Sequence, residues 1–189
     1  MSDPRSEPTP HYFSPAPDGP SDPRTVRVTL PDLSVDLVSD RGVFSHRRLD
    51  PGTRLLLLEA PLPLPDETTI VDLGCGWGPI ACVTARRAPH ATVWAVDVNE
   101  RARRLTAANA ERLGLTNVRV AAPDDVPADL TVDRLLSNPP IRIGRDRLRR
   151  LLAIWLDRLS PTGRAHLVVQ RHLGADSLAR HLVGTGHPV

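Results

Sequence analysis

The order of apolar and polar residues predicts a β-hairpin near the start of the chain. Residues 25–30 and residues 33–38 both alternate between the two kinds of side chain, and Pro31-Asp32 between them is typical of a turn. Asp50-Pro51-Gly52 then indicates the beginning of a short helix that reaches Leu58. We expect the hairpin and this helix to precede the main body of the fold.

From residue 67 onward, apolar runs typical of buried strands alternate with stretches of helical periodicity. We expect helices near residues 79–87, 100–113, 145–159 and 175–183, and a last strand at residues 165–170. This alternation is typical of a mostly parallel α/β sheet with helices on both faces. Only residues 123–132 separate the third and fourth strands, so the helix that usually connects such strands is expected to be vestigial or missing.

The 189 residues are enough for a single domain with a substantial core. Residues 1–24 hold seven prolines and are expected to be mostly disordered, whereas residues 25–66 hold the hairpin and the short helix. Residues 67–189 then form the α/β core.

Charge and composition exclude several classes of protein. The net charge of +2 is too close to neutral for a general nucleic-acid binder. The two cysteines are too few and wrongly spaced for a zinc site, so no metal is expected. No apolar run approaches about 18 residues and no signal peptide is visible, which predicts a soluble, cytoplasmic protein without a membrane partner.

The first candidate site is the turn after the strand at residues 69–73. This turn contains Gly74, Gly76 and Gly78, which let the backbone approach a ligand, and the helix after it favours an anionic group at its N-terminus. Asp72 favours an ammonium group instead of a pyrophosphate, and Pro79 stands where a dinucleotide fingerprint has its third glycine. These preferences fit the amine and carboxylate of S-adenosylmethionine (SAM). A plain tight turn is the alternative.

Two further candidate features follow the ends of later strands. Asp97 ends the apolar run of residues 91–96, where an acidic side chain can accept both ribose hydroxyls of a nucleoside, a feature that NAD-dependent enzymes share. Ser137-Asn138-Pro139-Pro140 ends the fourth strand, and its prolines lack N–H donors, so the Asn138 oxygen and nearby carbonyls are left as acceptors. Such acceptors suit a planar exocyclic amine, although N-P-P alone is usually only a turn.

Together these motifs resemble class I SAM-dependent methyltransferases of the RsmC type, the guanine-N2 methyltransferases of small-subunit ribosomal RNA. The similarity covers nearly the whole chain and rests on seven segments: HYFS (11–14), GVFS (42–45), LDPGTRLLL (49–57), VDLGCGWGPIA (71–81), VDVNERA (96–102), SNPPIR (137–142) and LVVQRHLGADSL (167–178). The resemblance implies a Rossmann-like fold, SAM as methyl donor and an amine nitrogen, commonly guanine N2 in RNA, as acceptor. Residues 67–189 would then be the SAM-binding catalytic core.

The resemblance also assigns roles to residues by position. The glycine turn should line the methionine end of SAM, Asp97 the ribose, and Asp124 the adenine amine. The expected cofactor-binding residues are Asp72, Gly74, Cys75, Gly76, Gly78, Asp97, Val98, Asp124 and Asn138. The expected catalytic residues are Asn138, Pro139, Pro140 and Ile141, and the expected substrate-binding residues are Phe44, Ser45 and Arg142.

Two features depart from the family pattern. Related N-P-P enzymes often have an aromatic residue at the fourth position, where it stacks on the base, and this chain has Ile141. The family fold also continues with a final pair of strands, whereas only His187-Pro188-Val189 follow the last expected helix. The strand at residues 165–170 is therefore expected to be an open sheet edge, through which the chain could associate with a second copy.

Arginines follow the N-P-P segment directly. Arg142, Arg145, Arg147, Arg149 and Arg150 are candidates for contact with RNA phosphates, and the helical ones could equally form an ordinary solvated face opposite an apolar stripe. We expect Trp77 to pack on the sheet in preference to bordering the cofactor.

The sequence thus predicts a SAM-dependent methyltransferase that acts on an amine, and the resemblance implies N2 of a guanine in ribosomal RNA as that amine. An N-methyltransferase of a small metabolite or a protein amine is the alternative within enzymes, because no separate RNA-recognition domain is visible. A SAM-binding module that is inactive without the final strands is the alternative outside enzymes.

Overall fold

The computed structural model describes residues 20–140 and 143–189. The chain begins with an antiparallel hairpin, β1 (Arg24–Thr29) and β2 (Ser34–Ser39), in which Thr25 lies opposite Val38 and Val28 opposite Val35. Helix α1 (Pro51–Glu59) follows, with Asp50 as its N-cap. Both predicted elements are confirmed.

Five parallel strands then form the central sheet, in the order β5-β4-β3-β6-β7. They are β3 (Thr69–Leu73), β4 (Thr92–Val96), β5 (Val118–Ala121), β6 (Val132–Ser137) and β7 (Leu159–Leu167). The helices that alternate with them are α2 (Pro79–Arg87), α3 (Glu100–Arg112), α4 (Arg145–Leu156) and α5 (Ala175–Gly184). The predicted Rossmann-like α/β fold is confirmed. As expected, no α-helix connects β5 to β6, and the connection contains only the short 3-10 helix η1 (Pro123–Asp125). Another 3-10 helix, η3 (Arg171–Leu173), precedes α5.

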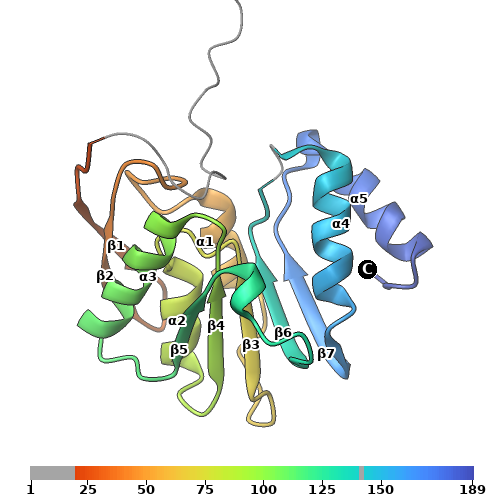
Figure 1. Cartoon of the computed structure of the whole chain (residues 1–189), viewed down its shortest axis with the longest axis horizontal. Coiled ribbons are helices and arrows are strands. Elements are labelled where there is room, and N and C mark those ends of the chain that lie inside the picture. The colour runs from red at the N-terminus through yellow and green to blue at the C-terminus, as the bar shows by residue number, and fades with distance from the viewer. Residues whose placement is uncertain (1–19, 141–142) are drawn as a thin grey trace, which may run out of the picture.

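The two faces of the sheet have separate cores because side chains alternate along each strand. Ile70 faces a cluster formed with the hairpin, α1, α2 and α3. Its neighbour Val71 faces a second cluster formed with α4 and α5. Figure 1 shows the hairpin beside α3 at one end of the sheet, and α4 and α5 beyond β6 and β7 at the other.

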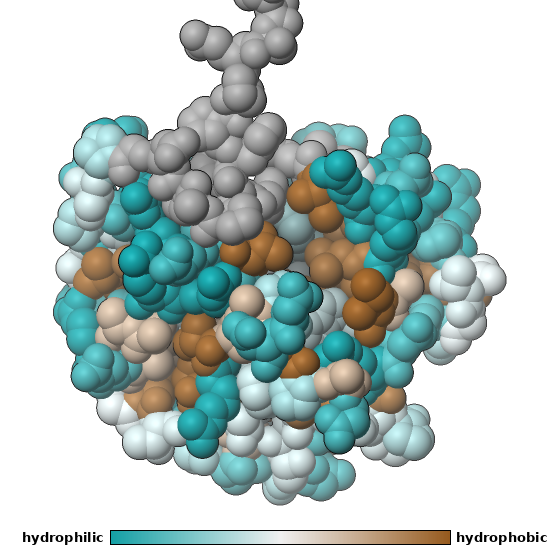
Figure 2. Space-filling model, in the orientation of Figure 1, coloured by the Kyte–Doolittle hydropathy of each residue, from teal (hydrophilic) through white to brown (hydrophobic). Residues whose placement is uncertain are grey.

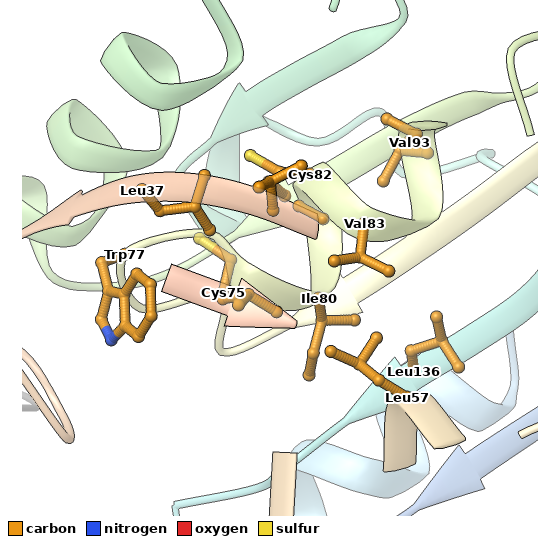
Figure 3. Close-up of a cluster of buried hydrophobic side chains, with 14 of the residues drawn as sticks. Leu37, Leu57, Cys75, Trp77, Ile80, Cys82, Val83, Val93 and Leu136 are labelled. Atoms are coloured by element: carbon orange, nitrogen blue, oxygen red, sulfur yellow. The ribbon is translucent and has the colours of Figure 1, made fainter. Parts of the chain in front are cut away.

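Residues of α2 and of the glycine turn fill the first core. Figure 3 shows Trp77, Cys75 and Ile80 among the buried side chains of β2, α1, β4 and β6. Trp77 is 2% exposed, so it packs inside the protein as expected.

The predicted helix at residues 145–159 and the last predicted strand differ from the structure at their boundary. The sequence predicts a helix to residue 159 and a strand at residues 165–170, whereas α4 ends at Leu156 and β7 already begins at Leu159. Leu159 pairs with Val132, and the register then shifts before Arg134 pairs with Arg164. Leu159 continues the helical spacing of the apolar residues of α4, but its pairing with β6 makes it part of the sheet.

The hairpin is attached to α3 by one buried amide. Asn109 accepts from the N–H of Val38 at 2.7 Å and donates to the carbonyl of Val38 at 2.8 Å. The same side chain donates to the carbonyl of Trp77 at 2.9 Å. Asn109 thereby fixes the hairpin and the glycine turn against one helix.

Candidate active site

The glycine turn after β3 lies at the carboxyl end of the parallel strands. Gly74, Gly76 and Gly78 all have positive φ angles, of 80°, 59° and 90°. The N–H of Gly74 donates to the carbonyl of Val96, at the end of β4, at 2.8 Å. A Cβ added at Gly76 would meet no atom of the described residues within 4 Å, whereas one at Gly78 would lie 3.0 Å from Thr106. The turn therefore packs closely against α3 at Gly78 and leaves open space at Gly76.

Asp72 is fully buried beneath this turn, and only one of its two oxygens has a hydrogen-bond partner in the part of the chain that the structure describes. Oδ2 accepts from the N–H of Ala81 in the first turn of α2 at 2.9 Å. Oδ1 has no hydrogen-bond partner among the described residues. Burial raises the pKa of Asp72 to about 8, and the nearby charge of Asp97 adds to the rise while the Ala81 N–H opposes it. A buried carboxyl group with a free oxygen favours a cationic partner, and the ammonium group of SAM has that chemistry.

Asp97 supports the turn from the end of β4. Its Oδ2 accepts from the N–H of Gly76 at 2.9 Å and its Oδ1 accepts from the N–H of Asn99 at 2.8 Å. Burial raises the pKa of Asp97, and these backbone N–H donors partly offset the rise. Asn99 itself caps α3, so Asp97 is not the helix cap. A carboxylate offers about four lone-pair directions, so Asp97 can still accept from ribose hydroxyls.

The N-P-P segment lies next to the glycine turn. Ser137 donates from its Oγ to the carbonyl of Leu73 at 2.6 Å, which joins the end of β6 to the end of β3. A Cβ added at Gly74 would lie 4.0 Å from Cδ of Pro140. The structure therefore brings Asp72, Asp97 and the N-P-P segment to one edge of the sheet.

Two residues that the sequence analysis had not selected hold Asn138. Its Nδ2 donates to Oδ2 of Asp50 at 2.8 Å and to Oγ1 of Thr53 at 3.0 Å. Both partners belong to the start of α1, 88 and 85 positions earlier in the chain. The only signal in the sequence was their place in the LDPGT segment.

The loop between β2 and α1 also reaches this edge. Ser45 is the single non-glycine residue with a positive φ angle (52°) among the described residues, and its Oγ donates to the carbonyl of Arg48 at 2.7 Å. The side chain of Asn99 donates to the carbonyl of Gly42 at 2.9 Å, which ties the loop to the start of α3. Phe44 is 46% exposed in this loop. Backbone strain of this kind concentrates at functional sites.

The remaining predicted site residues are more scattered. Asp124 is exposed in η1, after the end of β5, and Val98 is 43% exposed beside Asp97. Ile141 and Arg142 lie outside the described residues. Arg145, Arg147 and Arg150 are exposed on α4, whereas Arg149 is half-buried. Hydrophilic residues cover the beginning of α4 at the upper right of Figure 2, and hydrophobic residues lie below them.

No three His, Cys, Asp or Glu side chains in residues 20–140 and 143–189 are grouped so that they could hold a metal ion. In the same residues, no helix is long and apolar enough to cross a membrane.

Comparisons with known proteins agree on the family. The model of the methyltransferase small domain matches residues 34–189. YbxB of Bacillus subtilis (strain 168), described as an uncharacterized protein, is 35% identical over 175 residues, which are 91% of this chain and 87% of that protein. Ribosomal RNA small subunit methyltransferase C of Pseudomonas aeruginosa (strain UCBPP-PA14) is 35% identical over 170 residues. That match covers 78% of this chain but 49% of the relative, so the chain spans about half the length of such relatives.

Among solved structures, the fold resembles that of the T. thermophilus 16S rRNA N2 G1207 methyltransferase (RsmC) in complex with AdoMet and guanosine. The TM-score is 0.71 at 23% identity, over 87% of this chain and 47% of the other.

Proposed function

The chain belongs to the methyltransferase small domain family and is a SAM-dependent methyltransferase, and we propose that it methylates the N2 amine of a guanine in ribosomal RNA. The observation that carries the proposal is the position of Asn138 beside the glycine turn, with its amide nitrogen already bonded to Asp50 and Thr53. The ribosomal RNA methyltransferases among its relatives support an RNA substrate.

In this proposal the chain holds SAM at the carboxyl edge of β3 and β4. Asp72 pairs with the ammonium group through its free oxygen, the open turn at Gly76 receives the backbone of the methionine end, and Asp97 accepts from the ribose. Asp124 is assigned to the adenine amine. When bound, SAM supplies an electrophilic methyl group on a positively charged sulfur.

The protein's part in the transfer is to position the acceptor. Asn138 Oδ1 and a carbonyl near Pro139 accept the two N–H groups of the exocyclic amine, so the nitrogen lone pair is directed toward the methyl group. Alignment and a polar surround account for most of the rate enhancement, and no strong general base is required. Phe44 and Ser45, in the loop after β2, and Ile141 and Arg142 are assigned to the base and its nucleotide.

The arginines of α4 are assigned to the RNA backbone. Arg145 and Arg147 are exposed on the first turn of this helix, which follows the N-P-P segment, and Arg150 is exposed further along. Replacing all three with alanine should weaken RNA binding and flatten its salt dependence, by about 0.7–0.9 in logarithmic slope for each phosphate that the variant no longer neutralises. Arg112, exposed at the far end of α3, provides the matched control, since its replacement should leave the slope unchanged.

The variant Asn138→Ala tests the assignment of the acceptor site. SAM affinity should stay within a few-fold of the unmodified protein while methyl transfer is suppressed, because Asn138 is assigned mainly to the amine. Calorimetry measures the first quantity and transfer of a labelled methyl group to ribosomal RNA the second. Normal methyl transfer by the variant would show that the N-P-P segment is only a turn and does not bind the acceptor amine.

The same assay with other acceptors separates the alternatives. Transfer to free guanosine, small amines or ribosomal proteins, without transfer to ribosomal RNA, would favour a metabolite or protein substrate. SAM binding without transfer to any acceptor would instead favour a binding module.

A further inference from the structure

The contact between the start of α1 and the N-P-P segment joins two distant parts of the chain. Helix α1 and the upper end of β6 lie side by side in Figure 1, and Asn138 follows β6 directly. Nδ2 of Asn138 has two hydrogens, and it has two acceptors at bonding distance: Oδ2 of Asp50 at 2.8 Å and Oγ1 of Thr53 at 3.0 Å.

We propose that Asp50 and Thr53 are positioning residues that fix which way the Asn138 amide faces. A carboxylate has no proton to donate, so only the nitrogen of the amide can face Asp50. The amide oxygen then faces away from α1 and is left as an acceptor. This inference rests on the proposed function, in which that oxygen accepts from the substrate amine.

The position of Asp50 is itself determined by the helix. Its Oδ2 also accepts from the N–H of Thr53 at 3.0 Å, as the N-cap of α1. Thr53 is 5% exposed, so its hydroxyl is held in place by packing. One helix start therefore supplies both acceptors for the amide, and the cap that stabilises α1 also orients Asn138.

Gly52 provides the space for this contact. A Cβ added there would lie 2.9 Å from Oδ2 of Asp50 and 3.6 Å from Nδ2 of Asn138. Its φ angle is not in the left-handed region, so alanine would cause no backbone strain and would favour the helix. Gly52→Ala therefore displaces the Asp50 carboxylate without removing any hydrogen-bonding group.

The test separates capping from positioning. Asp50→Ser keeps a good helix cap but is too short to reach Asn138, whereas Asp50→Asn keeps an oxygen that can serve both partners. Thr53→Val keeps the shape of the side chain without its hydroxyl, and Thr53→Ser restores the hydroxyl. We expect Asp50→Ser, Thr53→Val and Gly52→Ala to lower kcat by about tenfold or more, since small errors of alignment are costly. The conservative variants Asp50→Asn and Thr53→Ser should rescue most of the loss.

Two further readouts exclude a merely structural effect. The melting temperature and the affinity for SAM should stay close to those of the unmodified protein in Asp50→Ser and Thr53→Val, which both keep a cap on α1. Hydrogen exchange of the Asn138 side-chain amide, followed by NMR on protein labelled at asparagine, should be slow in the unmodified protein. It should become faster in Asp50→Ser and Thr53→Val.

Each outcome decides the inference. The inference would be overturned if kcat were unchanged in Asp50→Ser and Thr53→Val. It would also be overturned if kcat fell in these variants only to the extent that their stability or SAM affinity fell. Unchanged amide exchange in these variants would overturn it as well. If the unmodified protein methylates no amine, the proposed function fails instead, and amide exchange alone decides whether Asp50 and Thr53 hold Asn138.

Discussion

At the scale of single residues, Asp72 carries the clearest electrostatic signature of the site. It is a fully buried carboxyl group, one of whose oxygens has no hydrogen-bond partner in residues 20–140 and 143–189, and burial raises its pKa to about 8. In the unfolded chain the same group has an ordinary pKa near 3.9. Between these two values the folded protein binds more protons than the unfolded one, so this group lowers the free energy of unfolding as the pH rises.

The variant Asp72→Asn should therefore be more stable than the unmodified protein at alkaline pH. We expect its melting temperature, measured without SAM, to exceed that of the unmodified protein by a few degrees at about pH 8, with a difference that shrinks toward pH 4. The same variant should bind SAM more weakly, because the amide cannot pair with the ammonium group. Parallel pH profiles of the two proteins would contradict this account of Asp72.

Single residues also show where sequence reasoning stops. Asp72, Asp97 and Asn138 could be selected because each lies within one residue of the end of a strand, and the carboxyl ends of parallel strands meet at one edge. Asp50 and Thr53 could not be selected from the sequence, because they lie 88 and 85 positions from Asn138 and their contact with it depends on how α1 packs. Local spacing carries no signal for such a pair.

At the scale of elements, the hairpin and α1 to α3 follow from local patterns and caps. The end of α4 does not, because Leu159 continues the apolar spacing of the helix. Its pairing with Val132 is a contact between strands that the helical period cannot reveal. Asn109 is a similar case, since it bonds to β2 and to the glycine turn from the middle of α3.

The fit between the glycine turn and α3 can be tested at Gly78. Gly78→Ala and the matched control Gly114→Ala place alanine at φ angles of 90° and 66°, so both should lose about 1–2 kcal/mol of stability. The new Cβ would lie 3.0 Å from Thr106 in Gly78→Ala, and it would not approach Thr106 in Gly114→Ala. The hydroxyl of Thr106 donates to the carbonyl of Gly76 at 3.1 Å, so a shift of Thr106 would disturb the glycine turn. We expect SAM affinity to fall about tenfold or more in Gly78→Ala alone, by calorimetry. An equal loss of SAM affinity in both variants would refute the claim that the close packing of Gly78 on Thr106 shapes the SAM site.

At the scale of the whole molecule, β7 is the end strand of the described sheet. It pairs with β6, and no other described strand pairs with it. An end strand with free backbone groups tends to recruit another chain. We expect a protein of these 189 residues to self-associate through β7 while its site, built on β3, β4 and β6, keeps its geometry.

Sedimentation over a wide range of concentrations measures this association. Hydrogen exchange should show the amides of β7 becoming protected as the protein concentration rises, and those of β3 unchanged. A monomer at every concentration would refute the expectation and leave the assignment of the site intact.

The central claim concerns the whole molecule acting on its substrate, and mass spectrometry of nucleosides tests it most directly. Small ribosomal subunits from a strain that lacks the gene would be incubated with the purified protein and SAM, then digested to nucleosides. The account predicts that N2-methylguanosine appears with the unmodified protein and not with Asn138→Ala. A methyl group on any other atom, or none on ribosomal RNA while SAM is bound, would contradict it.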